Sequence, residues 1–194
     1  PTWLTADSIG LAIDQNAVVL GLDGKVKRQK TAGIVNALSW TNSGNNVLFT
    51  EEDRVVMLDE NGAKRFFTNE KDGRFYNPVV SPNGGQAVVH NLNGHLYLID
   101  LAKGGCIDLG EGLAASWSPD GKRIVCNVST DDGHNITSSD IILIDVKAKT
   151  RKQITNTADR TEMYAAWAPD GARIAYGDEK TGSIFVHAIE GGAK

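Results

Sequence analysis

The chain has 194 residues, 41% of them hydrophobic, and a formal net charge of −4 at neutral pH. This length and apolar content suit one folded domain and exclude a disordered chain. The acidic balance argues against a nucleic-acid binder, and no apolar stretch approaches the roughly 18 residues that a membrane span needs.

The first repeat that the sequence predicts covers residues 1–33 and contains short aliphatic runs at residues 9–12 and 17–23. Their composition and the turn-forming residues that follow them are typical of strands. Residues 1–5 suit two places. They are either the first strand of this repeat or an outermost strand of the last repeat, because their Leu-Thr ending matches residues 154–155.

Four further repeats share a strand that ends at a large apolar residue and runs into a tight turn. The copies read WTNSG at 40–44, VSPNG at 80–84, WSPDG at 117–121 and WAPDG at 167–171, and their first residues lie 40, 37 and 50 residues apart. We therefore place the repeats at about 34–72, 73–111, 112–160 and 161–194. A recurrence of this size indicates a repeat architecture.

Two more strand-like elements follow each turn. Apolar runs occupy residues 55–59, 96–100, 141–145 and 184–187, and the first three end in Asp. A polar, alternating run that ends in Thr occupies residues 63–68 and 150–155, as expected of a half-exposed outer strand. Each repeat thus predicts four strands, A to D, and no segment shows a sustained helical period. Four-stranded units of about 40 residues are the blades of β-propellers.

The turn signature has a physical reason. Pro presets a backbone angle for the turn, Asp can accept a hydrogen bond from the nearby backbone, and Gly supplies the positive φ that reverses the chain. A flat Trp just before the turn suits the wedge between neighbouring blades. We therefore interpret Trp40, Trp117 and Trp167 as packing residues.

The WSPDG turn, followed by a (K/R)-I-(A/V) strand and an I-x-(L/V)-x-D strand, resembles the TolB-like propellers over residues 34–189, and more loosely over 1–33. The resemblance implies an all-β fold, a β-propeller of four-stranded antiparallel blades. It also implies a protein that acts outside the cytoplasm, in the periplasm or an equivalent compartment, and binds other proteins. Members typically have six blades, whereas this chain has about five repeats and nothing that corresponds to the α/β domain before the TolB propeller.

The last repeat supplies strands A to C, but the sequence ends at residues 191–194 before a D strand. We expect residues 1–194 to form a single propeller domain, which is either a five-bladed ring or part of a larger, six-bladed-type propeller. An incomplete ring would expose apolar blade faces, which makes self-association an alternative.

The sequence offers little for catalysis. It has no Gly-x-Ser-x-Gly elbow, no His-Glu-x-x-His and no Cys-x-x-Cys, and its four His are scattered over three repeats. The predicted inner strands at 37–40, 114–117 and 165–167 hold no acidic or His residue. We therefore expect no enzyme, no cofactor and no metal site. Cys106 and Cys126 lie in apolar runs and are expected to be buried free thiols.

The long spacing of the fourth repeat predicts an enlarged loop between strands B and C at residues 129–140. A solvated insertion, a protein-contact loop and a metal loop are its three interpretations; Asp131, Asp132, Asn135 and Asp140 would be the oxygen ligands, although their spacing differs from that of an EF-hand. Loops B–C and D–A of a propeller share one face, where Arg and Tyr would be favoured anchors. The predicted binding residues are Arg74, Tyr76, Asp132, His134, Asn135, Arg160, Glu162 and Tyr164.

The leading hypothesis for function is a non-enzymatic scaffold for protein–protein interaction. The alternative is a substrate-gating propeller domain of a prolyl-oligopeptidase-type serine peptidase, which a downstream catalytic domain in the gene would reveal. An enzyme with its site in a central channel is a weaker alternative, because the inner strands lack acidic and His side chains.

Overall fold

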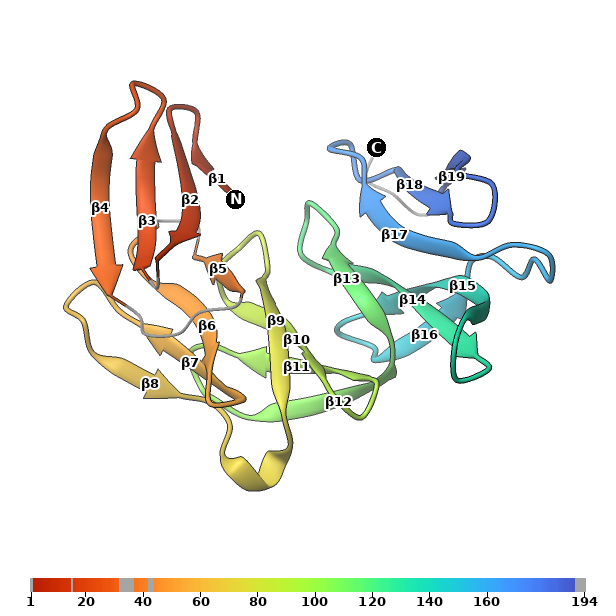
Figure 1. The fold of residues 1–194 in the computed structure, drawn as a ribbon, viewed down its shortest axis with the longest axis horizontal. Coiled ribbons are helices and arrows are strands. Elements are labelled where there is room, and N and C mark those ends of the chain that lie inside the picture. The colour runs from red at the N-terminus through yellow and green to blue at the C-terminus, as the bar shows by residue number, and fades with distance from the viewer. Residues whose placement is uncertain (1, 15, 32–36, 42–43, 191–194) are drawn as a thin grey trace. The chain divides into compact units, whose positions relative to one another are not determined.

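A computed structural model describes all residues except 1, 15, 32–36, 42–43 and 191–194. The described chain is all-β, apart from one short 3₁₀ turn at Glu70–Asp72 (Figure 1). Among the described residues, no helix has the length and apolar character to cross a membrane.

The strands form five sheets, and the neighbours in each sheet follow one another along the chain. Sheet 1 contains β1 (Thr2–Thr5), β2 (Ser8–Ile13), β3 (Asn16–Gly21) and β4 (Val26–Thr31). Sheet 2 contains β5 (Leu38–Trp40), β6 (Val47–Glu51), β7 (Arg54–Leu58) and β8 (Lys64–Phe66). Sheet 3 contains β9 (Phe75–Val80), β10 (Gln86–Asn91), β11 (His95–Asp100) and β12 (Cys106–Glu111). Sheet 4 contains β13 (Leu113–Trp117), β14 (Arg123–Asp131), β15 (Ile136–Asp145) and β16 (Thr150–Gln153). Sheet 5 contains β17 (Glu162–Trp167), β18 (Arg173–Asp178) and β19 (Ile184–Ala188).

Two compact units divide the chain. The first comprises residues 1–93 and 97–108, with sheets 1 and 2 and most of sheet 3. The second comprises residues 94–96 and 109–194, with sheets 4 and 5. The single domain over 1–194 stays a prediction.

The strand pairing decides between the two places that the sequence allows for the N-terminal strand. β1 pairs antiparallel with β2, with Trp3 opposite Ile9, so it is the first strand of sheet 1. Sheet 5 has three strands among the described residues, and residues 191–194 lie outside them.

The tight turns have the geometry that their sequence predicts. In the 117–121 copy, the Ser118 hydroxyl donates to Asp120 Oδ1 at 2.6 Å and lowers the pKa of that carboxyl, while the Arg123 N–H donates to Ser118 Oγ at 2.9 Å. Gly121 has a φ of 68°, which only Gly adopts without strain. The 80–84 copy repeats these contacts, since Ser81 donates to Asn83 Oδ1 at 2.8 Å. Asn42 and Ser43 of the 40–44 copy lie outside the described residues.

Polar side chains also fix the two outer strands. The Asp that ends the third strand closes the next turn, as where Asp59 Oδ1 accepts the N–H groups of Asn61 and Ala63 at 2.9 and 2.8 Å. The Thr after an outer strand reaches back to the third strand. Thr68 Oγ1 accepts the Val55 N–H at 2.9 Å, and Thr155 Oγ1 accepts the Ile141 N–H at 2.8 Å; both contacts are buried.

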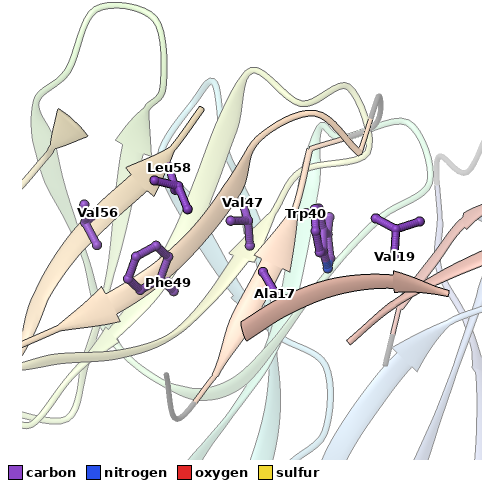
Figure 2. Close-up of a cluster of buried hydrophobic side chains, with 7 residues drawn as sticks. All are labelled: Ala17, Val19, Trp40, Val47, Phe49, Val56 and Leu58. Atoms are coloured by element: carbon purple, nitrogen blue, oxygen red, sulfur yellow. The ribbon is translucent and has the colours of Figure 1, made fainter. Parts of the chain in front are cut away.

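Trp side chains join consecutive sheets within each unit. Trp40 of sheet 2 is 4% exposed and packs with Ala17 and Val19 of sheet 1 (Figure 2). Trp167 of sheet 5 packs against the cluster that contains Val125 and Ile141 of sheet 4, and its indole N–H donates to the Ser116 carbonyl at 3.2 Å. Trp117 is buried as well. The packing role predicted for these three residues is thus seen in the structure.

Two expectations are wrong in detail. Cys126 is buried, but Cys106 is exposed because it begins β12, an outer strand whose first three side chains are all exposed. Residues 129–140 are mostly a hairpin rather than an irregular loop, since β14 and β15 stay paired from Ser129↔Ser139 to Asp131↔Ile136. Cross-strand hydroxyl contacts, such as Thr130 Oγ1 to Ser138 Oγ at 2.7 Å, extend the ladder.

Candidate functional site

A recess in the first unit lies where sheet 2 meets the first strand of sheet 3. It has a volume of about 470 Å³. Its lining residues are Ala37, Thr50, Glu51, Glu52, Asp53, Phe75, Tyr76 and Asn77. The Phe75 N–H donates to the Asp53 carbonyl at 2.8 Å, which ties the start of β9 to the β6–β7 turn.

Three carboxylates on the recess wall each pair with a cation. Asp53 Oδ2 accepts from Arg74 Nε at 2.6 Å, and Glu52 Oε2 accepts from Arg54 Nη2 at 2.6 Å. The side chains of Arg74 and Asp53 are 66% and 47% exposed, so their ion pair adds little stability and both groups are accessible to a partner. The third pair joins Lys64 and Glu51.

Tyr76 forms the aromatic side of the recess. Its ring stacks on the His90 imidazole with centroids 5.3 Å apart and the planes 23° from parallel. Burial lowers the pKa of His90 below its ordinary value of 6.5, and a hydrogen bond with the Asn77 backbone opposes this shift. The His90 imidazole is therefore uncharged at neutral pH, and it packs against the Tyr76 ring.

The second unit presents the tip of the β14–β15 hairpin. Asp132 Oδ1 accepts the N–H groups of His134 and Asn135 at 2.9 and 2.8 Å, and these bonds lower the pKa of the Asp132 carboxyl. Asp132 thus closes the turn, while the exposed side chains of His134 and Asn135 point to solvent.

The connection from β16 to β17 lies beside the base of this hairpin. Ser139 forms a parallel bridge with Thr161, and Lys180 Nζ donates to the Thr137 carbonyl at 3.3 Å. Asp140 accepts from Gln153 Nε2 at 3.0 Å and from the Thr157 N–H at 3.3 Å. In the part of the chain that the structure describes, no three His, Cys, Asp or Glu side chains lie together as a metal site would require.

Comparison with solved structures identifies the fold. The TolB structure from Agrobacterium tumefaciens matches at a TM-score of 0.62, with 19% identity over 84% of this chain and 60% of that one. The β-propeller domain of Myceliophteria thermophila Cps50 (Swd1) matches at 0.69, with 13% identity over 98% of this chain and 65% of the other. The tricorn protease matches at 0.70, with 16% identity over 91% of this chain and 18% of that chain.

The chain has the fold of a β-propeller. Its five sheets are the blades that the repeat predicts, four of them with four strands and the last with three among the described residues. No family model matches the sequence. The chain spans less than two thirds of the length of each of these three structures.

Three of the five first strands share a distortion that the sequence does not reveal. Asn77, Ala114 and Tyr164 have φ angles of 47°, 51° and 58°, and each lies three residues before the large residue that ends its strand. Each coincides with a shift in strand register, which marks a β-bulge. The bulge turns a blade's first strand and exposes 62% of Tyr164.

The predicted binding residues fall into both units and differ in accessibility. Arg74, Tyr76, His134, Asn135 and Tyr164 have at least partly exposed side chains. The Arg160 guanidinium lies 4.4 Å from the centre of the Phe185 ring and so packs within its own blade. Glu162 is fully buried, with Thr157 Oγ1 donating to its Oε1 at 3.2 Å, so it offers no side chain to a partner.

Sequence reasoning also missed two acidic features. Glu162 begins β17, an inner strand that we expected to lack acidic side chains, because that strand starts three residues earlier than predicted. The Glu51–Asp53 wall of the recess was missed because two non-glycine residues, Glu52 and Asp53, form a turn with φ angles of 48° and 63°. Gly or Asn is the usual signal for such a turn.

Proposed function

We propose that this propeller is a non-enzymatic scaffold that binds another protein through its blade ends. These are the regions around Tyr76 on sheet 3 and Tyr164 on sheet 5. The recess beside Tyr76 is the observation that carries the proposal, because a concave site with an aromatic wall and an exposed Arg–Asp pair suits an interface anchor. The extracytoplasmic location implied by the sequence resemblance to TolB-like proteins belongs to the same proposal.

The second unit supports the same kind of contact. Tyr164 is 62% exposed, and its backbone is held in a conformation that costs an L-residue about 1 kcal/mol or more. Tyr is enriched among the residues that dominate binding energy. A protein partner is the class of ligand that fits large exposed side chains on a rigid sheet.

Site-specific photo-crosslinking tests the proposal. A photoreactive amino acid at Tyr76 or at Tyr164 should give a discrete protein adduct in a lysate of the source organism. The matched control is Ile107, which is 40% exposed on the outer strand β12 and should give no such adduct. Equal adducts at all three positions, or none at any, would contradict a docking role for the blade ends. An adduct with a Gly-x-Ser-x-Gly domain would favour the peptidase-gating alternative.

A further inference from the structure

Asn–Gly sequences occur at residues 61–62, 83–84 and 93–94. In such a pair, the backbone nitrogen of the Gly can attack the side-chain carbonyl carbon of the Asn, because Gly has no side chain to obstruct the approach. All three Asn residues are exposed, and the Gly residues that follow them have positive φ angles of 84°, 71° and 85°. Exposure and the conformation of the Gly therefore do not distinguish the three pairs.

Hydrogen bonds hold two of the three Asn side chains. Asn83 Oδ1 accepts from Ser81 Oγ at 2.8 Å and from the Gly85 N–H at 3.0 Å. Asn93 Nδ2 donates to the Tyr97 hydroxyl at 3.1 Å. Each of these amides must give up its hydrogen bonds before its carbonyl carbon can turn toward the next backbone nitrogen, which slows the attack.

The side chain of Asn61 is not held in this way. Its backbone N–H donates to Asp59 Oδ1 at 2.9 Å, but no described residue forms a hydrogen bond with its side-chain amide. The attacking nitrogen is also held less closely. The Gly62 N–H donates to the Asp59 carbonyl at 3.2 Å, whereas the Gly84 N–H donates to the Ser81 carbonyl at 2.8 Å.

The turn between β7 and β8 in blade 2 (sheet 2) has the same hydrogen-bond pattern as the turn between β3 and β4 in blade 1 (sheet 1). In blade 2, the Asp59 N–H donates to the Ala63 carbonyl at 3.0 Å. In blade 1, the Gly21 N–H donates to the Lys25 carbonyl at 2.8 Å. The two turns therefore correspond residue by residue, and Asp23 occupies in blade 1 the place that Asn holds in blade 2.

The residue that begins each turn decides whether the side chain in the middle is held. Blade 1 begins with a Gly, which has no side chain, and Asp23 Oδ1 accepts the Lys25 N–H at 3.0 Å. Blade 2 begins with Asp59, whose own Oδ1 accepts the Ala63 N–H at 2.8 Å. Asn61 is free because Asp59 already accepts the hydrogen bond that would otherwise hold it.

We propose that Asn61 is a site of spontaneous deamidation and that it reacts before the other two Asn–Gly pairs. The Gly62 nitrogen bonds to the side-chain carbonyl carbon of Asn61 and loses its proton. The side-chain nitrogen leaves with that proton as ammonia, and a succinimide ring forms. Water then adds to either carbonyl of the ring and opens it, which gives aspartate or isoaspartate without any oxidant or reductant.

The two products differ in how they fit the turn. Aspartate is compatible with it, because Asp23 already occupies the same place in blade 1. Isoaspartate carries the main chain through its Cβ, which lengthens the turn and disrupts the hydrogen bond from the Gly62 N–H to the Asp59 carbonyl. Either product adds one negative charge to a chain whose formal net charge is −4.

Peptide mapping by mass spectrometry, after incubation of the folded chain at mildly alkaline pH, measures the rate at each pair. Trypsin cleaves after Arg54 and Lys64, which isolates Asn61 in one peptide, and after Arg74 and Lys103, which places the other two pairs in a second. Asn61 should react at least about fivefold faster than either of the others, which corresponds to the net cost of one hydrogen bond. In concentrated urea the three rates should become alike, because the turns are lost.

The variant Asp59→Ala tests the reason for this selectivity. Without the Asp59 carboxylate, the Ala63 N–H becomes available to Asn61, so deamidation there should slow by about fivefold, while the rate at Asn83 stays unchanged. Circular dichroism confirms that the variant is folded. Equal rates at all three pairs in the folded wild-type chain, or a faster rate at Asn83, would overturn the proposal. A folded D59A variant that reacts at Asn61 as fast as wild type would also overturn it.

Discussion

Individual residues show where local strain is built into the fold. Asn77, Ala114 and Tyr164 occupy the left-handed region at matching positions of three blades, although none is Gly. Such a conformation costs an L-residue about 1 kcal/mol or more and persists where the surrounding structure imposes it. Because the strain recurs at one offset from the turn, we attribute it to the blade's own architecture.

Substituting Ala114 tests this strain. Ala114→Gly should leave the free energy of unfolding unchanged or raise it by up to about 1 kcal/mol, because Gly adopts a positive φ without penalty. The neighbouring Ala115 lacks a positive φ, so Ala115→Gly should cost about 0.5–1 kcal/mol. Urea denaturation measures both changes. Equal destabilisation by the two substitutions would show that position 114 is not strained.

The buried His90 predicts a pH dependence of stability. Because burial lowers its pKa in the folded state, the unfolded chain binds a proton more readily near pH 6.5 and below. The contribution of His90 to the free energy of unfolding should be constant well above pH 6.5. It should decrease as the pH drops below 6.5. Replacing His90 with Phe keeps a ring beside Tyr76 and should remove this contribution. The free energy of unfolding of wild type and H90F is measured by denaturation from pH 7.5 to 5. If it changes with pH equally in both proteins, His90 is not the source of the pH dependence.

Within the blades, side chains that accept hydrogen bonds from backbone N–H groups stabilise the turns and the outer strands. The third strand's Asp caps one turn, and the Thr after the outer strand satisfies a buried N–H that would otherwise lack a partner. These short-range signals explain why the turns and strands could be predicted from spacing and composition.

Substitution at Thr155 measures the outer-strand contact. Thr155→Val keeps the shape of the side chain but leaves the Ile141 N–H without its acceptor, which should cost about 1–3 kcal/mol of unfolding free energy. Thr155→Ser retains the hydroxyl and should recover most of that loss. Thermal or urea denaturation compares them, and equal stability of T155V and wild type would show that the hydrogen bond contributes nothing.

The sequence was less informative about the candidate site. Turn residues and apolar alternation are local, so all five blades and the roles of Trp40, Trp117 and Trp167 could be predicted. The recess at Glu51–Asp53 depends on contacts between blades, and the burial of Glu162 depends on where β17 begins. No short sequence motif predicts either the recess or the burial of Glu162. The enlarged loop proved to be a hairpin because its Ser and Thr side chains pair across the strands.

At the scale of the molecule, stability within each unit comes from blades packed face to face. Trp40, which ends the first strand of blade 2, lies against Gly10 of blade 1. Figure 2 shows the same ring between Ala17 and Val19 of blade 1. The contact recurs in the second unit, where Trp167 packs against blade 4. The recurring Trp in the sequence thus corresponds to a recurring contact between one blade and the blade before it.

A methyl group added at Gly10 should disrupt that interface. Its Cβ would come within 2.2 Å of the Trp40 ring, so Gly10→Ala should destabilise the chain by about 1–3 kcal/mol through overpacking. Gly177, at a different place in the second strand of blade 5, has no atom within 4 Å of an added Cβ, so Gly177→Ala should be tolerated. Urea denaturation compares the two, and equal tolerance of both would show that Trp40 does not lie against Gly10.

Amide hydrogen exchange, followed along the chain by mass spectrometry, tests the blade repeat most directly. Buried second strands should exchange slowest, so protection should peak four times, in β6, β10, β14 and β18, and fall in the outer strands β8 and β16. A single protected block, or peaks that do not follow the recurring turn, would contradict a chain of stacked four-stranded blades.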